Sequence, residues 1–194
     1  MDTNTTDHFD ALSPELTMAI FSYLLDHDLC RCSVVSRKWR AISNNESLWR
    51  SLCKESWEGK KGWSGLANLS VDQVASALVT KNALSAAKLP LNDHVSWKLW
   101  LQLSHKDSQR TCITVDEMCG DWILHIGINQ KCDPIPTRFE SDFSFSSENT
   151  GVLKWEIVGN AIKLPDFPPL QVARTADWGW RLYCPYFAFY EAEV

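Results

Sequence analysis

The sequence predicts an α+β protein in which helices precede a β-sheet. In the first half, apolar residues recur every three or four positions, as at Leu16, Ile20 and Leu24, which is helical spacing. From residue 111 onward the pattern changes to alternation with period two, with turn residues and many aromatic side chains. We therefore expect an all-helical region over residues 12–103, followed by an antiparallel β-sheet or a small curled barrel.

Short helices with identifiable start signals are expected near the N-terminus. Ser13 can cap the first helix, because its hydroxyl accepts a free backbone N–H. Pro14 suits the first helical position, where a missing N–H costs nothing. The acidic segment 26–28 should end this helix. Three further helices are expected over residues 29–35, 36–42 and 46–57, the last capped by Asn45.

The same N-terminal stretch carries a series of short motifs in a fixed order. They are LSPEL at 12–16, IFSYL at 20–24, Asp28-Leu29, VVSRKWR at 34–40 and Leu48-Trp49. In order and spacing these motifs resemble the F-box, the module that attaches a substrate receptor to the Skp-type adaptor of SCF ubiquitin ligases. That family usually has Pro directly after the first Leu, whereas here Ser13 takes that place and Pro14 follows. The resemblance covers about a fifth of the chain.

The resemblance implies an apolar face of short helices that forms a shared core with exposed helices of the adaptor. The adaptor would in turn link the chain to a cullin and a RING protein. The alternative is that the same side chains form the internal core of an ordinary three-helix unit, and Trp39 and Ile20 in particular could be mainly internal. The adaptor-binding residues implied by the resemblance are Leu12, Pro14, Leu16, Ile20, Leu24, Leu29, Val34, Val35, Trp39 and Trp49.

A Gly-rich segment and two further helices are expected between the F-box motifs and the β region. Residues 58–65 contain three Gly and two Lys and are the best linker candidate, although Trp63 within them should pack back on a neighbour. A capping-box pattern opens a helical region over residues 70–89, which Pro90 stops. Another short helix is expected over residues 95–103.

Alternating segments separated by turn signals predict the strands. Gly159-Asn160 is a hairpin signal, and residues 177–179 form another turn. Because many strands come from one short stretch of chain, the sheet should be curled or closed. The expected strands are residues 111–115, 122–128, 152–158, 161–164, 171–175, 180–183 and 187–191.

Two features of the β half suggest binding. Gly120-Asp121-Trp122 resembles the Gly-x-Trp that opens lipocalin barrels, in which case a ligand pocket is possible; the alternative is a Trp in an ordinary sheet core. Near the C-terminus, Trp, Tyr and Arg side chains are concentrated, and these types often anchor protein interfaces. Alternation along the strands should turn about half of them inward. The candidate target-binding residues are Trp178, Trp180, Arg181 and Tyr186.

Charge and cysteine usage exclude several classes of partner. Residues 111–194 carry 12 acidic and 6 basic side chains, a net charge of −6, so we expect no nucleic-acid partner. Seven Cys, an odd number, and a polar start unlike a signal peptide favour reduced thiols and a cytoplasmic or nuclear location. Cys30-Arg31-Cys32 with His27 and Cys53 could suggest zinc, but Cys side chains two apart on a helix diverge, so packed thiols are favoured. No apolar run approaches the roughly 20 residues that span a bilayer.

Motifs for catalysis are also missing from the sequence. None of the five His lies in a hydrolase or metalloprotease motif, and there is no glycine-rich phosphate loop. We expect a chain that performs no chemistry itself and needs no cofactor or metal.

The sequence therefore predicts a substrate-recognition subunit of an SCF-type ubiquitin ligase, with an unknown protein target and no membrane partner. One alternative is a sensor whose β domain binds a small molecule in a large apolar pocket inside the sheet. Another is a protein that uses the adaptor only as a stabilising partner, outside any ligase. The predicted parts are a flexible tail at 1–9, the F-box at 10–57, a helical linker region at 58–108 and a β domain at 109–194.

Overall fold

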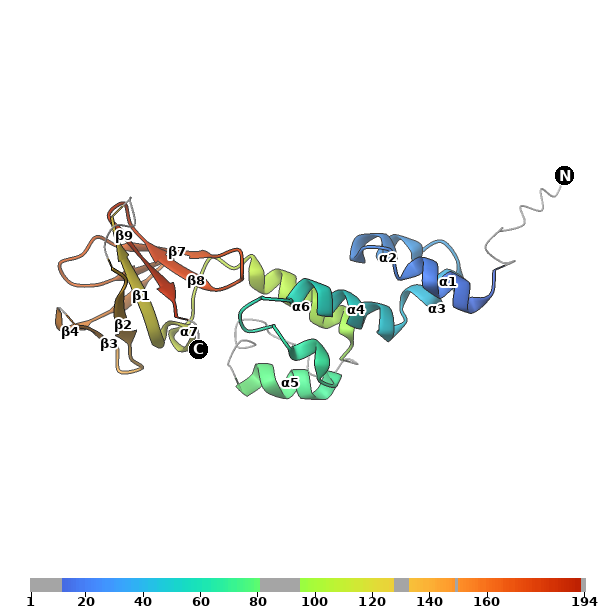
Figure 1. Cartoon of the computed structure of the whole chain (residues 1–194), viewed down its shortest axis with the longest axis horizontal. Helices are drawn as coiled ribbons and strands as arrows, with labels where there is room; N and C mark the ends of the chain where they lie inside the picture. The colour runs from blue at the N-terminus through green and yellow to red at the C-terminus, as the bar shows by residue number, and fades with distance from the viewer. Residues whose placement is uncertain (1–11, 81–94, 128–132, 149, 193–194) are drawn as a thin grey trace.

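The computed structural model describes residues 12–80, 95–127, 133–148 and 150–192. The molecule is elongated, with helices at one end and a β-sheet at the other (Figure 1). Each end has its own buried apolar cluster. The predicted α+β class, with helices first and a curled antiparallel sheet last, is confirmed.

Three short helices form the N-terminal end: α1 (Pro14–Phe21), α2 (Asp26–Cys32) and α3 (Arg37–Ser43). As predicted, the Ser13 hydroxyl caps α1 by accepting a hydrogen bond from a backbone N–H, with Pro14 at the first turn. The helix expected at 29–35 begins earlier, at Asp26. The acidic residues lie in its first turn, where negative charge is favourable, and do not form a break between helices.

A pair of longer helices, α4 (Glu46–Trp57) and α6 (Trp97–Ser108), connects the two ends of the molecule. Asn45 caps α4, as predicted. The two helices are held together by a buried hydrogen bond from the Trp57 indole to the Ser104 hydroxyl, at 2.8 Å. Helix α6 extends five residues beyond its predicted end, because the polar residues of its last turn contact the sheet and the loop that follows α4.

Residues 58–80, which follow α4, pack against the helical half. Trp63 is 3% exposed and packs on Trp57 with ring centroids 5.0 Å apart, as predicted. A short 3-10 helix, η2 (Leu66–Asn68), follows, and then α5 (Val71–Thr80), which opens with the predicted capping box at Ser70. The rest of the helical region expected up to residue 89 lies outside the described residues.

The prediction of a strand at residues 111–115 is wrong. Thr114 instead caps a one-turn helix, α7 (Val115–Met118), and Glu117 completes the capping box by accepting hydrogen bonds from the Thr114 backbone and hydroxyl. The local cap signal prevails over the alternation of apolar and polar residues.

The β domain is an antiparallel sheet that curls almost into a barrel. The spatial order is β4-β3-β2-β1-β9-β8-β7-β6-β5, so the two edge strands are neighbours in sequence and the chain itself spans the remaining gap. The strands are β1 (Gly120–Ile126), β2 (Ile135–Phe139), β3 (Ser144–Ser147), β4 (Thr150–Lys154), β5 (Glu156–Val158), β6 (Ala161–Lys163), β7 (Leu170–Arg174), β8 (Trp180–Tyr183) and β9 (Phe187–Glu191).

Four strands differ from the sequence prediction. β2 and β3 were not expected, because β2 contains Pro136 and β3 is mostly Ser. The single strand expected at 152–158 is divided at Trp155, whose side chain turns into the core and whose indole donates a hydrogen bond to the Ser144 carbonyl. This turn separates β4 from β5 and allows the sheet to close.

Aromatic side chains fill the interior of the barrel. Phe139 is fully buried, and its ring centroid lies 4.8 Å from that of Phe145, 5.7 Å from Phe189 and 5.9 Å from both Trp122 and Trp155. An interior packed in this way has no room for a ligand of ordinary size. In the described parts of the chain, no helix is long and apolar enough to cross a membrane.

The packing around Phe139 predicts a large effect of truncation. Changing Phe139 to Ala should destabilise the barrel by about 3–5 kcal/mol, because it leaves a cavity among four other rings. Urea unfolding followed by near-UV circular dichroism measures this change. Val152→Ala is the control, since Val152 is 74% exposed on β4 and should cost well under about 1 kcal/mol. Equal stabilities for the two variants would contradict the described core.

Candidate functional site

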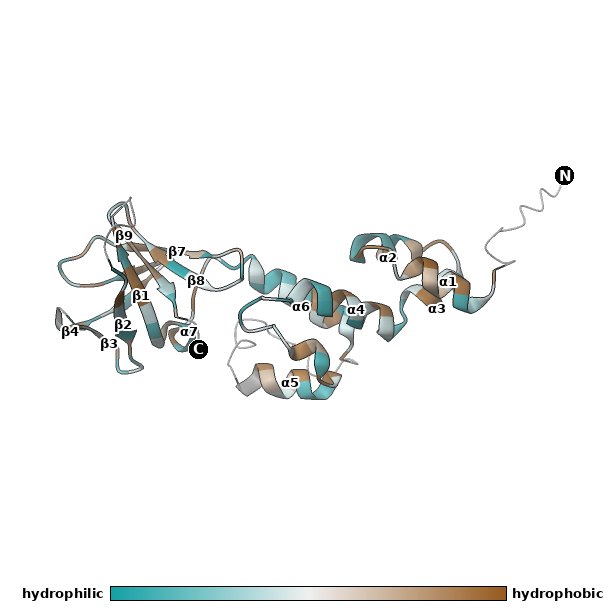
Figure 2. Cartoon of the chain, viewed as in Figure 1, coloured by the Kyte–Doolittle hydropathy of each residue, from teal (hydrophilic) through white to brown (hydrophobic). Residues whose placement is uncertain are grey.

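An apolar surface that no other described residue covers lies on α1 and just after α2. Leu16 is 57% exposed, Ile20 is 42% exposed, and Val34 and Val35, just after α2, are 75% and 62% exposed. Pro14 is also exposed. Figure 2 shows hydrophobic residues along these helices at the end of the molecule opposite to the barrel. Single exposed apolar residues are common, but a group of this kind marks an interaction surface.

The arrangement of α1 explains why this surface faces outward. Thr17 and Phe21, four residues apart, are buried against the rest of the chain. The neighbouring pair, Leu16 and Ile20, therefore faces solvent. An apolar row on the solvent side of a helix has no stabilising role in the isolated chain, and it gains free energy only when a partner covers it.

Two predicted adaptor-binding residues are internal. Leu29 and Trp49 are each 1% exposed, and the Trp49 indole donates a hydrogen bond to the Ser43 carbonyl at 2.7 Å. They support the three-helix unit from within, so the expectation that they lie on its outer face is corrected. Trp39 is half-buried against Phe21 with ring centroids 5.3 Å apart. Leu12 and Leu24 are half-buried as well.

Two further residues belong to the exposed surface, and sequence reasoning missed them as site residues. Tyr23 is 89% exposed and Leu25 is 58% exposed, both in the turn between α1 and α2. They adjoin Leu24 in an apolar stretch of the sequence, which was the available signal. The surface thus runs from α1 through this turn to the end of α2.

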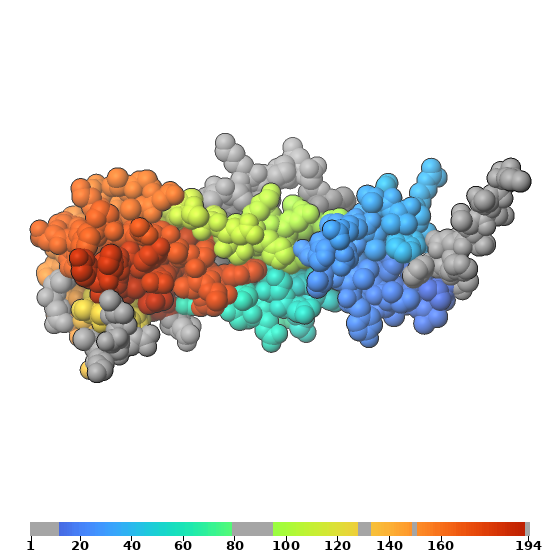
Figure 3. All heavy atoms as spheres, turned by 90° about the horizontal axis from the view of Figure 1, so that it is seen from above, coloured from blue at the N-terminus to red at the C-terminus, as the bar shows by residue number. Residues whose placement is uncertain are grey.

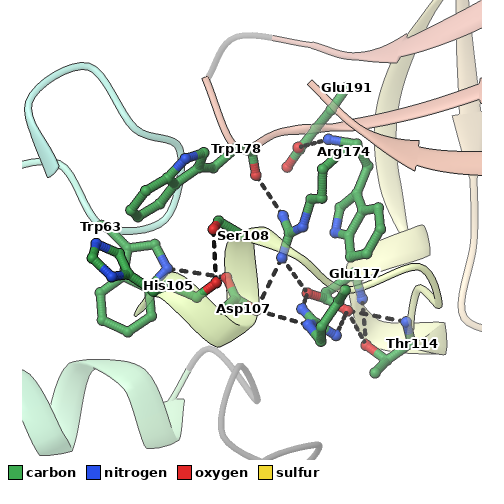
Figure 4. A network of polar contacts seen from close by, with 11 residues as sticks. Trp63, His105, Asp107, Ser108, Thr114, Glu117, Arg174, Trp178 and Glu191 are labelled. Carbon is green, nitrogen blue, oxygen red and sulfur yellow. Dashed lines mark hydrogen bonds and ion pairs between the residues drawn. The ribbon is translucent and has the colours of Figure 1, made fainter. Parts of the chain in front are cut away.

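The second notable region is the junction between the helices and the barrel. Four charged side chains form a cluster here, and each of them is less than a fifth exposed. They are Asp107 of α6, Arg110, Glu117 of α7 and Arg174 of β7 (Figure 4). Arg174 Nη2 lies 2.9 Å from Asp107 Oδ1, and Arg110 Nε lies 2.7 Å from the same oxygen. Two cations and two anions balance in this cluster, so it can be buried without a net charge.

The cluster changes the interpretation of two predicted target-binding residues. Trp180 is 2% exposed, with the Arg174 guanidinium stacked on its ring at 3.8 Å. Trp178 packs on the helical half, edge-on to His105. Both Trp residues therefore hold the junction together, and the expectation that they form an open binding face is corrected.

The other two predicted residues lie elsewhere. Tyr186 is 69% exposed in the turn between β8 and β9, and Arg181 is half-buried on β8. The four predicted target-binding residues are therefore not one site.

The segment predicted as a linker is fixed to the barrel. The Lys61 backbone N–H donates to the Asp177 carbonyl at 2.7 Å, and the Lys61 ammonium donates to the Glu191 carbonyl at 2.8 Å. The Lys60 ammonium donates to the Ala176 carbonyl at 2.9 Å. In the space-filling view the C-terminal strands lie directly against the middle of the helical half (Figure 3). The two halves are thus joined by many contacts, in addition to the chain itself.

A cleft of about 770 Å³ lies beside this junction, between the Gly-rich segment 59–64 and the barrel. Its walls include Lys61, Glu117, Arg174 and Trp180, so charged groups surround it. This is not the enclosed apolar pocket inside the sheet that the small-molecule sensor hypothesis requires.

Burial and charge pairing shift the pKa values of two residues at the junction. Burial alone would raise the pKa of Glu117, but hydrogen bonds from Arg110 and Thr114 and the charge of Arg110 lower it below its ordinary value. Burial lowers the pKa of Arg174 despite the nearby carboxylates.

The three Cys residues considered for zinc are packed thiols, as expected. Burial, together with the charge of Glu46, raises the pKa of Cys53 to about 12. Cys30 and Cys32 pack against the helical core. Among the residues that the structure describes, no group of three or more His, Cys, Asp or Glu side chains could hold a metal ion.

Comparison with known proteins supports the N-terminal assignment. Residues 10–55 match the family model for an F-box-like domain, which confirms the predicted F-box. The chain is 45% identical to mouse F-box/LRR-repeat protein 5 over 56 residues, and 44% identical to human F-box only protein 8 over 50 residues. These matches cover 29% and 26% of this chain, but only 8% and 15% of the two relatives.

The depressed pKa of Glu117 predicts a pH-dependent contribution to stability. Changing Glu117 to Gln should cost about 3 kcal/mol at neutral pH, because Arg110 and Arg174 lose an anion. Since the pKa is lower in the folded state, this contribution is present above the unfolded value of about 4.5 and is lost as pH falls below it. Denaturant unfolding of both proteins between neutral and acid pH should show their difference shrinking.

The matched control for this prediction is Glu156→Gln. Glu156 pairs with Lys163 in an exposed position, so its loss should cost at most about 1 kcal/mol. A difference between wild type and Glu117→Gln that stays constant down to acid pH would contradict the assigned role of Glu117.

Proposed function

We propose that this chain, which carries an F-box-like domain at residues 10–55, is a non-catalytic substrate-recognition subunit of an SCF-type ubiquitin ligase. The observation that carries the proposal is the outward-facing apolar surface of α1 and α2, which has no partner among the described residues. The exposed surface lies within the F-box-like domain, and both support a Skp-type adaptor as the partner.

The proposed function depends on the positions of the helical end and the β domain in the molecule. The adaptor holds the helical end next to the cullin and its RING protein, and the β domain at the far end of the molecule holds the target (Figure 1). Binding a target close to the ubiquitin-charged enzyme raises the local concentration of its lysines, as in any tethered reaction. The fixed junction around Arg174 supports this role, because a rigid connection limits where the target can lie. This activity belongs in the cytoplasm or the nucleus.

The packed barrel bears on the alternative functions. A sensor that binds a small molecule inside the sheet is disfavoured, because aromatic rings around Phe139 fill that interior. A protein that uses the adaptor outside any ligase has the same helical surface, and only a measurement that includes cullin separates it from the proposal.

The exposed apolar surface predicts a specific loss of adaptor binding. Changing Val34 to Asp places a charge where the adaptor's apolar helices should pack, so capture of purified Skp-type adaptor should fall by at least about tenfold. Val152→Asp is the matched control, since Val152 on β4 is 74% exposed and Val34 is 75% exposed. Equal capture by wild type and both variants would show that this surface does not bind the adaptor.

Cullin recruitment distinguishes a ligase subunit from a protein that only uses the adaptor for stability. The chain, the adaptor, a cullin and its RING protein should elute together in size-exclusion chromatography. Elution of a complex that contains the adaptor but excludes the cullin would contradict the ligase role, while leaving the adaptor-binding assignment in place.

A further inference from the structure

The outer surface of the barrel carries aromatic side chains around one arginine, over the adjacent strands β8, β9 and β1 (Figure 1). Side chains alternate along a strand, so Arg181 and Tyr183 leave β8 on the side opposite to the buried Trp180 and Leu182. Tyr190 of β9 pairs directly with Arg181. These side chains therefore lie on the outside of the barrel.

Arg181 is held between rings. Its guanidinium carbon lies 4.5 Å from the centroid of the Tyr183 ring and 5.6 Å from that of Tyr190. His125 of β1 meets Tyr190 edge-on, with centroids 5.4 Å apart. Contacts of this kind restrict the rotamers of a long side chain, so the guanidinium is oriented before any partner arrives.

Arg181 differs from the other arginines of the barrel, which have anionic partners. Arg138 pairs with Asp121 and Glu140, and Arg174 belongs to the buried junction cluster. The Arg181 side chain makes no hydrogen bond or ion pair with any residue that the structure describes, and its Nε is buried without a partner. A partly dehydrated cation without an anion is costly, so this position is complementary to an anion from another molecule.

A small residue lies beside Arg181 on the same face. Ala188 pairs with Tyr183 on one side and with His125 on the other. It is buried but belongs to neither core cluster, so the larger side chains around it on the outer face cover it. Ala188 therefore forms the floor of this face, beneath the rings and beside the guanidinium.

We propose that this outer face, made of His125, Arg181, Tyr183, Ala188 and Tyr190, binds a segment of a target protein through an aspartate or glutamate side chain. The inference rests on the proposed function, because it names where the β domain holds its target. A carboxylate can accept two parallel hydrogen bonds from a guanidinium, and Tyr and Arg are the residues that most often anchor interfaces.

A carboxylate suits this face better than a phosphate does. A phosphorylated side chain carries about −1.5 to −2 charges at neutral pH, and phosphate-reading sites use clusters of Arg. Arg181 is the one unpaired arginine among the described residues of the barrel, and residues 111–194 have a net charge of −6. One cation balances one carboxylate, and the acidic surroundings disfavour additional negative charge.

Short synthetic peptides test the proposal directly. Three immobilised pools share randomised apolar and tyrosine positions and differ only in a central Asp, Asn or phosphoserine. The full chain should bind the Asp pool at least about tenfold more tightly than the Asn pool, the difference expected for a charge-assisted hydrogen bond. Arg181→Gln should abolish that preference. Lys163→Gln, at an exposed barrel cation already paired with Glu156, should preserve it.

Folding and adaptor binding are measured separately in the same variants. Arg181→Gln should keep its thermal unfolding midpoint and its capture of Skp-type adaptor. Equal binding of the Asp and Asn pools, strongest binding of the phosphoserine pool, or an Asp preference that survives Arg181→Gln would each overturn the inference. If the adaptor binds but Arg181 has no effect, this inference fails alone. If the Asp preference depends on Arg181 but no adaptor binds, the proposed function fails and the chemistry of this face stands.

Discussion

The charge cluster of Asp107, Arg110, Glu117 and Arg174 is the interaction on which the arrangement of the molecule depends. It joins the last helix of the helical half to the one-turn helix and the seventh strand of the barrel. Burying four charges is favourable only when every one of them has a partner, so the geometry of this junction is narrowly defined. Trp180 beneath the Arg174 guanidinium excludes water from it. The helical end and the barrel therefore keep a fixed relation.

This fixed relation gives the two ends of the molecule different tasks. The helical end exposes apolar side chains that do not stabilise the isolated chain. Such a surface is typical of one side of a protein–protein interface. The barrel end has an aromatic core of its own. Its outer face carries Arg181, whose side chain has no anionic partner among the described residues. In the proposed function, the helical end takes an apolar partner and the barrel end takes a carboxylate of the target.

Much of the helical half was predictable because its signals are local. Ser13, Asn45 and Ser70 each cap a helix as the sequence indicates, since the capping hydrogen bonds span only two or three residues. Periodicity in α1 revealed an apolar row at Leu16 and Ile20 but did not show which row faces inward. The row that contains Phe21 faces inward, because tertiary packing decides which side of the helix is buried.

The sheet was harder to predict, because its pairings join residues that are distant in sequence. The missed strands, β2 with Pro136 and β3 with mostly Ser, have a low strand preference. Pairing of β2 with β1, and of β3 with β2, outweighs it. Likewise, the candidate binding residues within 178–181 are neighbours in the sequence, yet Trp180 is internal and Arg181 faces outward.

Amide hydrogen exchange of the full chain, with and without purified Skp-type adaptor, tests the central claim most directly. Exchange in residues 14–35 should be slower when the adaptor is present, because the exposed apolar surface becomes covered and its helices open less often. Exchange in the strands at residues 120–191 should not change. Protection confined to the strands, or no protection anywhere, would contradict the account.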